Sequence, residues 1–287
     1  MTTRVKLITD STCDLPREWI ERWDIAMLYP YVNFDEESFV DDGVALPTGE
    51  FYRRLAADKR LPKTSAFGVG AAQEAFSRQL AKAEHVVAIT VASRFSSIYN
   101  TVRLAAQEFG ESKVTVIDSG MVTMAAGWIV AAAAEAAQDG CGVTEVVTAA
   151  NDTRERVKLY AVIDNLDYLR RSGRVSSFVA SIGTILQIKP IIEVTGGQVN
   201  SIQRVRTMNK AVQSLVELAQ GQAPLEKLAI LHANNLTGAA ELRDRLADIA
   251  PANTVTIEIG TALGTHVGPG ALGISPVRKA TETLTQA

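Results

Sequence analysis

The chain has 287 residues, of which 47% are hydrophobic and 21% charged, and its formal net charge is −3. This length favours two domains, and this composition is typical of a globular protein with substantial cores. The small negative charge excludes a broad basic field of the kind that attracts nucleic acid or an anionic membrane.

Cysteine content and the N-terminal segment indicate the compartment. The two cysteines, Cys13 and Cys141, form neither a disulfide framework nor a metal-ligand spacing, and they are compatible with a reducing cytoplasm. The first residues lack the apolar run of a signal peptide. The most apolar long segment, Val122–Ala137, is too short for a bilayer span and is expected to form a buried helix. We therefore expect a cytoplasmic protein.

The first half of the chain alternates strands and helices. Strands are expected at Val5–Thr9, Met27–Phe34, His85–Val91 and Val114–Ile117. Helices are expected after Asp14, which is a plausible N-cap, and at Thr48–Ala57, Gly70–Lys82, Ser93–Phe109, Val122–Ala137 and Val143–Arg156. Strand, hydroxyl-rich loop and helix recur three times, and this alternation indicates a parallel sheet wound with helices.

The pattern changes after about residue 156. The following elements are expected to be strand Leu159–Ile163, helix Leu166–Arg174, a hairpin around Gly196-Gly197, helix Asn209–Ala219, strand Leu228–Ala233, helix Gly238–Ile249 and strand Thr254–Ile259. We therefore predict an α/β domain over residues 1–155 and a smaller α+β domain over residues 156–287.

Three loops carry hydroxyl and carboxyl groups at the expected carboxyl ends of the parallel strands. They are Asp10-Ser11-Thr12, the segment with Ser93, Ser96 and Ser97, and Asp118-Ser119. Ligands of such sheets bind beyond this edge. These loops are therefore candidates for a binding site.

A second candidate is the glycine-rich segment Leu263–Gly270, which contains His266 and follows an apolar strand. Glycines let the backbone and an imidazole approach a ligand without side-chain bulk. Thr64, Ser65 and Ser96 are further neutral donors on loops, and a set of such donors suits a carboxylate or acyl group. The alternatives are a simple turn at His266 and helix capping by the hydroxyls.

Two enzymatic alternatives use the same residues. Ser96, His266 and either Asp10 or Asp118 have the residue types of a hydrolase triad, but the Gly-x-Ser-x-Gly elbow is absent. Asp10-x-Thr12 is a weak signal for a phosphoryl-accepting aspartate, which needs a second acid and usually Mg²⁺.

Other common sites have no sequence signal. There is no dinucleotide motif, no P-loop and no metal-ligand cluster, so no cofactor is expected. We interpret His85 and His232 as structural residues, because each borders an apolar strand.

Two basic clusters lie in the second half: Arg170, Arg171 and Arg174, and then Arg204 and Arg206. Such charges form either a solvated face or a surface that docks an acidic partner or a phosphate.

Together, seven segments resemble the DegV family, and the match follows the chain in order almost from end to end. The segments are Asp10–Pro16, Lys63–Ser65, Ser93–Ser96, Ile117–Ser119, Tyr168–Arg174, Ile188–Pro190 and Gly264–Gly270. Members of this family include the fatty-acid-binding subunits of bacterial fatty acid kinase.

The resemblance implies a protein that holds one long-chain fatty acid in an apolar tunnel between two domains. It implies that Thr64, Ser96 and His266 bind the carboxylate, with Ser65 and Thr265 nearby. It also implies a separate ATP-dependent kinase subunit that forms the acyl phosphate, so that this chain is not itself the catalyst. Arg174, Arg204 and Arg206 match family positions near the head group or facing the kinase. A transient membrane contact fits this role, and nucleic acid does not. The alternatives for the same pocket are a serine hydrolase and a lipid-sensing regulatory protein that binds a partner directly.

Four positions depart from the family pattern, one of them Ser172, which replaces the first glycine of a usual Gly-Gly-Arg. Phe67 replaces a usual proline, and Ser97 and Ile98 replace a usual glycine and threonine. Phe67 and Ile98 are expected to add apolar bulk near the head group, where they would change the preference for the acyl chain.

Overall fold

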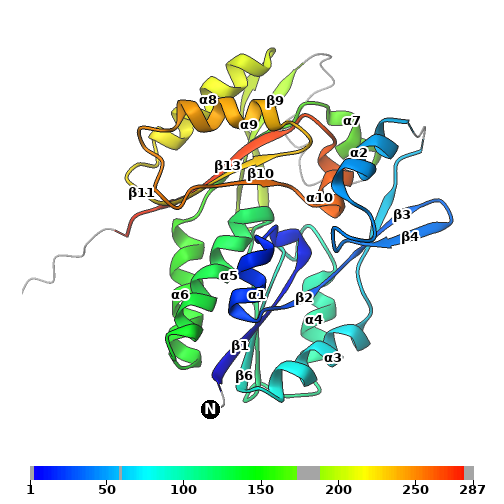
Figure 1. Ribbon diagram of the computed structural model, residues 1–287, viewed down its shortest axis with the longest axis vertical. Helices are drawn as coiled ribbons and strands as arrows, with labels where there is room; N and C mark the ends of the chain where they lie inside the picture. Colours follow the sequence, from blue (N-terminus) through cyan, green and yellow to red (C-terminus); the bar gives the residue numbers. More distant parts are fainter. Residues whose placement is uncertain (1–2, 58–59, 173–187, 281–287) are drawn as a thin grey trace, which may run out of the picture.

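The computed structural model describes residues 3–57, 60–172 and 188–280, and their strands form three sheets (Figure 1). The first sheet is parallel throughout. Its strands, in spatial order, are β2 (Ala26–Leu28), β1 (Thr3–Asp10), β6 (Ala83–Thr90) and β7 (Val114–Asp118). The predicted parallel sheet is confirmed.

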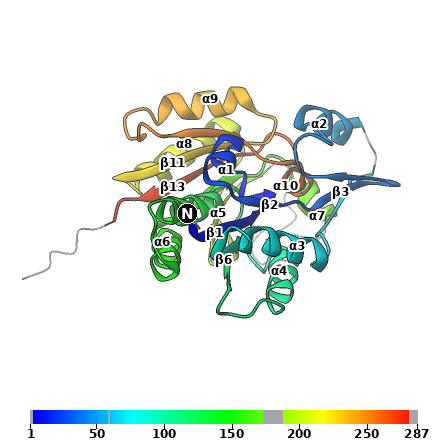
Figure 2. The ribbon, with the colours of Figure 1, turned by 60° about the horizontal axis from the view of Figure 1, so that its bottom comes forward.

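Helices cover both faces of this sheet. On one face lie α3 (Val69–Leu80) and α4 (Ile98–Ala106), and on the other lie α1 (Arg17–Trp23), α5 (Thr123–Gln138) and α6 (Val143–Arg156). Figures 1 and 2 show the two sets on opposite sides of β1. Successive side chains of β6 point to opposite faces of the sheet. Val86 and Ala88 therefore pack with α3 and α4, whereas Val87 and Ile89 pack with α5.

The second sheet has six strands, and only β11 and β12 pair in parallel. In spatial order they are β10 (Gln198–Val205), β9 (Lys189–Thr195), β8 (Leu159–Val162), β13 (Leu272–Arg278), β11 (Leu225–His232) and β12 (Val255–Glu258). One face is covered by α8 (Met208–Gln220) and α9 (Leu236–Arg245). The predicted α+β arrangement of the second half is confirmed.

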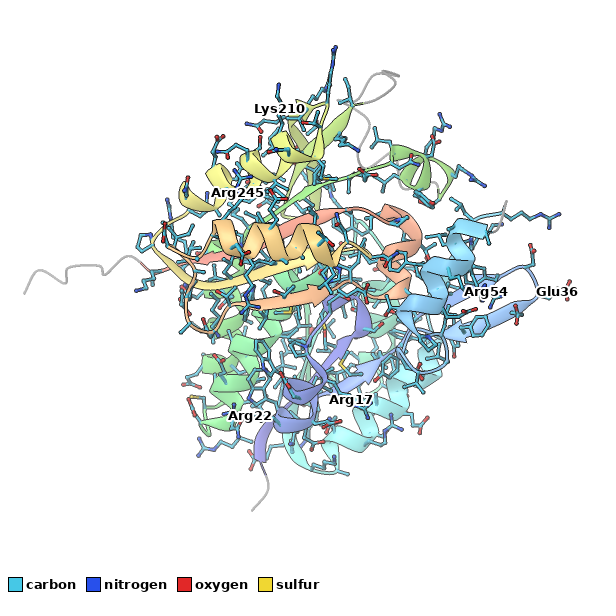
Figure 3. All side chains as sticks on the ribbon, turned by 45° about the horizontal axis from the view of Figure 1, so that its top comes forward. Arg17, Arg22, Glu36, Arg54, Lys210 and Arg245 are labelled. Atoms are coloured by element: carbon cyan, nitrogen blue, oxygen red, sulfur yellow. The ribbon has the colours of Figure 1, made fainter. Side chains whose placement is uncertain are left out.

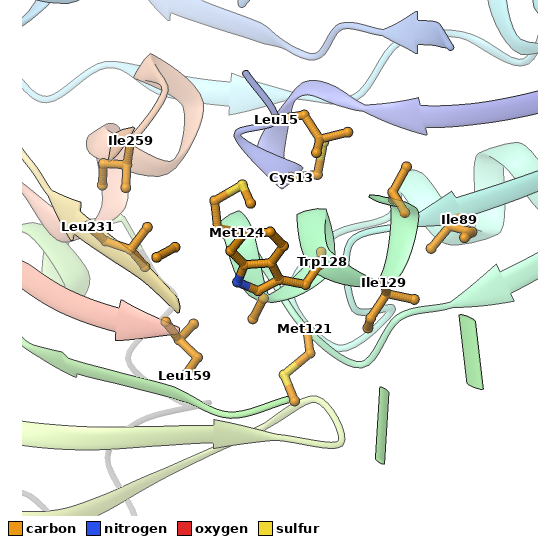
Figure 4. Close-up of a cluster of buried hydrophobic side chains, with 14 of the residues drawn as sticks. Cys13, Leu15, Ile89, Met121, Met124, Trp128, Ile129, Leu159, Leu231 and Ile259 are labelled. Atoms are coloured by element: carbon orange, nitrogen blue, oxygen red, sulfur yellow. The ribbon is translucent and has the colours of Figure 1, made fainter. Parts of the chain in front are cut away.

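The other face of the second sheet packs against the first domain through α5. Trp128 of α5 is 1% exposed, and its Nε1 donates a hydrogen bond of 3.1 Å to the carbonyl of Ser275 on β13. Figure 4 shows Trp128 among Met124, Leu159 and Leu231, which come from both halves of the chain. Since one hydrophobic cluster joins both sheets, the division after residue 155 stays a prediction.

The third sheet was not anticipated. It consists of β4 (Glu37–Val40), β3 (Tyr31–Phe34) and β5 (Lys63–Ser65), and α2 (Thr48–Ala57) lies beside it. The expectation of one strand over Met27–Phe34 is wrong, because that segment enters two different sheets as β2 and β3. Pro30 lies between them, and a proline lacks the N–H that a continuous ladder needs.

The third sheet is attached to α2 by Arg54. Its guanidinium lies 4.5 Å from the ring centroid of Phe34 and 5.3 Å from that of Phe39, and it forms an ion pair with Glu37. Figure 3 labels Arg54 on α2 and Glu36 on the turn that joins β3 and β4. Because Arg54 lies on α2 and its partners lie on β3 and β4, these contacts hold together the two elements that the loop between β4 and α2 connects.

The Ala-rich segment forms α5, as predicted, and it is buried almost all round. Within the described ranges, no helix combines the length and the apolar character that crossing a bilayer requires.

Asp14 does not cap α1, contrary to the expectation. Pro16 occupies the N-cap position without a side-chain hydrogen bond, and Asp14 adopts a left-handed backbone with φ of 51°. Its Oδ1 instead accepts a hydrogen bond of 2.8 Å from the backbone N–H of Gly260. Burial raises the pKa of Asp14 to about 7, and the nearby carboxylates Asp41 and Asp10 add to the rise.

Replacing Asp14 with asparagine is expected to stabilise the protein strongly at pH 8, less at pH 5, and little below pH 3.8. The folded pKa of Asp14 is raised, so its contribution to stability is fully present only below the unfolded pKa of 3.8 and is lost as pH rises from there to about 7. Asparagine keeps the acceptor for Gly260 and tolerates positive φ without a charge. At about 1.4 kcal/mol per pKa unit, the gain at pH 8 is about 2–4 kcal/mol.

Urea unfolding of both proteins at pH 5 and pH 8 measures this difference. Burial lowers the pKa of His85 and of His232, which reduces stability on the acid side in both proteins alike. The difference between wild type and Asp14→Asn therefore isolates Asp14. An equal difference at pH 5 and pH 8 would refute the assignment.

Candidate functional site

His266 lies in the last turn of a short helix, α10 (Thr261–Val267), rather than in the glycine-rich loop that the sequence indicated. Its Nε2 and the Oγ1 of Thr64, which lies on β5, are hydrogen-bonded at 3.0 Å across 202 positions of sequence. The structure therefore brings together two of the predicted site residues, one from each end of the chain.

Two glycines allow α10 to lie close to its neighbours. A Cβ at Gly264 would come within 2.9 Å of Phe51 and 2.8 Å of the Tyr52 hydroxyl, both on α2. A Cβ at Gly268 would come within 2.2 Å of the Tyr168 ring on α7 (Leu166–Arg171). The glycines around His266 thus serve close packing of its helix.

Thr64 and His266 line a pocket of about 290 Å³ that is rich in hydroxyl groups. Its other polar lining residues are Thr12, Ser65, Ser96 and Ser97. None of the described residues that line it carries a lysine, arginine or carboxylate side chain. An anion bound here would be held by neutral donors and the imidazole.

Ser96 lines the polar pocket and lies just before α4, whose N-cap residue is Ser97. Its Oγ accepts a hydrogen bond of 3.2 Å from the backbone N–H of Ile98 at the start of α4, as a cap does. The hydroxyl proton remains for an acceptor in the pocket. The N-terminus of α4 also directs the positive end of its dipole toward this region, which favours an anion.

Ser65 is similarly arranged at the edge of the pocket. Its Oγ accepts a hydrogen bond of 3.2 Å from Nδ2 of Asn33 on the neighbouring strand β3, and its own proton is available to a ligand. Ser65 is exposed, so its interaction with a ligand would be weaker than that of a buried donor.

A second, apolar cavity adjoins the hydroxyl-lined pocket. Its volume, on the same basis as that of the polar pocket, is about 120 Å³, and it lies against the face of the second sheet that is turned toward α5. Leu159, Ala161, Ile192 and Val199 are among its walls. Because its surface is almost wholly hydrocarbon, it suits an alkyl chain.

Four residues line both spaces: Phe95, Val122, Leu263 and His266. A single ligand could therefore extend from the polar pocket past His266 into the apolar cavity. This arrangement matches an amphiphile with a compact polar head and a long apolar tail.

Several other predicted residues lie outside these two spaces. Thr265 is fully buried, and its hydroxyl donates a hydrogen bond of 2.9 Å to the carbonyl of Thr261, so it faces its own helix. Phe67 packs in the core beneath α3 and α4 and does not line either space, contrary to the expectation. Ile98 lines the polar pocket as expected.

The arginines are separated from the pocket as well. Arg204 and the adjacent Arg206 are exposed at the end of β10, which is the outer strand of the second sheet. Neither lines the polar pocket. Arg174 lies outside the described residues.

His232 contributes to the wall of the apolar cavity, and its Nδ1 accepts a hydrogen bond of 3.4 Å from the backbone N–H of Asn235, as a structural residue does. Burial lowers the pKa of His232 although Glu258 lies 3.9 Å away, so its ring is neutral at pH 7. Its position at the carboxyl end of β11 was the available signal, since that is where ligands meet such strands.

Neither enzymatic alternative is assembled. The Asp10 carboxylate is fully buried and accepts hydrogen bonds from Thr12 and from the Val91 N–H. Asp118 accepts hydrogen bonds from the N–H groups of Ser93 and Gly120. Both acids thus hold backbone rather than orienting a histidine or receiving a phosphoryl group. In the described part of the chain, no cluster of ligating side chains could hold a metal ion.

A hydrocarbon cavity that adjoins a pocket of neutral hydrogen-bond donors is an arrangement suited to an amphiphilic ligand. Residues 4–279 match the model of the DegV family, which is described as a family of uncharacterised proteins. The chain belongs to the DegV family.

Curated relatives and solved structures agree with this assignment. A DegV domain-containing protein of Streptomyces coelicolor is 34% identical over 281 residues, covering 96% of this chain and 98% of that protein. The structure of DegV from Bacillus subtilis, described as a fatty acid binding protein, has a TM-score of 0.86 at 28% identity and covers 97% of this chain and 100% of that one. A DegV lipid binding protein of Thermotoga maritima has a TM-score of 0.84 at 28% identity, with coverage of 96% and 100%.

Proposed function

We propose that this chain binds one long-chain fatty acid, with the carboxylate in the hydroxyl-lined pocket and the alkyl chain in the apolar cavity. The observation that carries the proposal is the junction of the two spaces at His266 and Phe95. The fatty-acid-binding description of the Bacillus subtilis structure supports the same ligand class.

The energetics favour a long chain. Burial of an acyl chain of about sixteen carbons contributes on the order of 10 kcal/mol, at ~0.8 kcal/mol per methylene and before the cost of ordering. The hydroxyls and the imidazole then need only orient the head group. Neutral donors suit a ligand that must be released again, because a fixed arginine clamp would hold a doubly charged product more tightly.

We further propose that the bound carboxylate is presented to a separate ATP-dependent kinase, which forms the acyl phosphate. The resemblance to fatty acid kinase subunits supports this role, and so does the exposed position of Arg204 and Arg206. The carrier would then act in the cytoplasm and contact a membrane only briefly, to collect or deliver its ligand. Trapping of the acyl phosphate with hydroxylamine, with and without the partner, tests this part.

Mass spectrometry of the denatured protein, purified from a bacterial host, is expected to reveal a bound fatty acid. After removal of the lipid, the protein is expected to rebind hexadecanoic acid. A delipidated, folded protein with no affinity for acids of 14 to 18 carbons, the lengths that the family resemblance implies, would overturn the proposal.

Two isosteric variants test the head-group site. Thr64→Val removes the hydroxyl that bonds His266 and faces the pocket, and Thr265→Val removes a hydroxyl that bonds only its own helix. A hydrogen bond to a charged group is worth about 1.5–3 kcal/mol, so Thr64→Val is expected to weaken binding roughly 10- to 100-fold. Thr265→Val is expected to bind within about threefold of the wild type. Equal affinities of the two variants would place the carboxylate elsewhere.

A further inference from the structure

Asp41 joins three distant segments of the chain. It follows β4, is 6% exposed, and its Oδ1 accepts hydrogen bonds from Thr261 Oγ1 at 2.6 Å and from the Ala262 N–H at 3.1 Å. Its Oδ2 accepts a hydrogen bond of 2.6 Å from the Ser11 hydroxyl, in the 3-10 turn η1 (Ser11–Cys13). One buried carboxylate thus ties the start of α10 to the loop after β1.

The start of α10 depends on carboxylates from elsewhere in the chain. Its own N-cap residue is Gly260, which has no side chain to accept the first free N–H groups. Asp14 accepts from the Gly260 N–H, and Asp41 accepts from the Ala262 N–H and the Thr261 hydroxyl. A helix of seven residues is too short to be stable without such contacts.

The anchored end lies one turn from the site. Ala262 and His266 are four positions apart and so lie on the same side of α10, and both line the polar pocket together with Leu263. A hydrogen bond that fixes Ala262 therefore also fixes the position of His266 along the axis of α10 and its rotation about that axis. At the other end, the packing of Gly268 against Tyr168 limits movement away from α2.

We propose that Asp41 is a positioning residue for His266: it caps α10 from the loop after β4 and so holds the imidazole at Thr64. This inference rests on the proposed function for its effect on binding. Asp41 contacts Ser11, Thr261 and Ala262 and does not line the polar pocket.

The role of Asp41 requires an acceptor and not a negative charge. Asparagine at this position retains an oxygen for Thr261 and Ala262, and its amide can donate to the Ser11 hydroxyl. The carboxyl groups of Asp10, Asp14 and Asp41 lie close together, and a negative charge on one opposes ionisation of another. Loss of the charge at position 41 is therefore tolerated. Alanine at position 41 removes all three bonds.

The experiment compares Asp41→Asn and Asp41→Ala in the full chain. Three readouts are used: hydrogen exchange of peptides that cover residues 260–268 in the lipid-free protein, the NMR signal of the His266 ring, and the affinity for hexadecanoic acid. Asp41→Ala is expected to speed exchange in α10 but not in α5, to shift the ring signal and to weaken binding at least tenfold. Asp41→Asn is expected to stay within about threefold in affinity with an unchanged ring signal.

Thr261→Val serves as a second variant, because it removes one donor to Asp41 and keeps the carboxylate. It is expected to produce a smaller change of the same kind, and it keeps the inference testable if Asp41→Ala does not fold. Unchanged exchange, ring signal and affinity in Asp41→Ala, or equal losses in Asp41→Ala and Asp41→Asn, would overturn the inference. If the wild type binds no fatty acid, the proposed function fails, whereas exchange and the ring signal still decide the role of Asp41.

Discussion

Ala161→Phe is expected to abolish tight binding of hexadecanoic acid while leaving the protein folded. Ala161 lies on β8 and forms part of the wall of the apolar cavity, and its side chain is partly accessible. Leu159 and Ala161 face the cavity, whereas Tyr160 and Val162 face the core under α8 and α9. The added phenyl ring therefore enters space that the proposal assigns to the alkyl chain.

The size of the effect follows from the excluded methylenes. Displacement of roughly four methylenes at ~0.8 kcal/mol each costs about 3 kcal/mol, or more than 100-fold in affinity. An acid of eight carbons needs less of the cavity and is expected to lose little. Titration of the delipidated variant with acids of increasing length measures this shift in preference.

Ala247→Phe is the matched control, because Ala247 is exposed after α9 and lines neither space. It is expected to bind every chain length as the wild type does. Filling of the cavity also buries apolar surface, so the melting temperature of lipid-free Ala161→Phe is expected to stay level or to rise. If Ala161→Phe binds hexadecanoic acid with unchanged affinity, the chain does not occupy this cavity.

Gly268→Ala is expected to cost about 2–5 kcal/mol of stability, from backbone strain and overpacking together. Gly268 has φ of 69°, a conformation that residues with a Cβ rarely adopt. The new methyl group would also lie 2.2 Å from the Tyr168 ring, so α7 or α10 must move. Because Gly268 ends α10, fatty-acid affinity is expected to fall with stability.

Gly70→Ala is the control for the second prediction. Gly70 lies in the first turn of α3, and a Cβ there meets no atom within 4 Å. Alanine is the better helix former by about 1 kcal/mol, so this variant is expected to be as stable as the wild type or more stable. Urea unfolding of both variants decides the matter, and equal midpoints would show that α10 tolerates a methyl group at position 268.

The double variant Gly268→Ala/Tyr168→Ala separates strain from overpacking. Removal of the ring relieves the contact but leaves the positive φ. Recovery of part of the lost stability, relative to Tyr168→Ala alone, is therefore expected. Full recovery would assign the whole effect to packing.

Much of the site was predictable from the sequence. Thr64, Ser65, Ser96 and His266 were candidates as neutral donors on loops, the family resemblance implied the same four, and all of them line one pocket. Thr265 was not distinguishable from them, because the direction of a side chain on a short helix depends on how the helix is seated. The cavity-lining position of His232 carried no specific pattern, because it is an isolated histidine at a strand end.

By itself, the sequence determined the parallel sheet, the buried helix α5 and the α+β second half. These features rest on local periodicity, because alternating apolar residues and turn residues act within a few positions of one another. The division of Met27–Phe34 into two strands also had a local cause in Pro30.

Only the tertiary structure decided that the glycine-rich segment around His266 forms a helix. Its residues taken alone indicate a turn, and the groups that stabilise the helix are Asp14 and Asp41, more than 200 positions earlier in the chain. Likewise, the cavity arises where the second sheet and α10 meet Phe95, Val122 and Thr123 of the first half, and it is a property of neither half alone. Capping by distant side chains and the shape of a space between packed layers depend on three-dimensional placement, which local pattern does not encode.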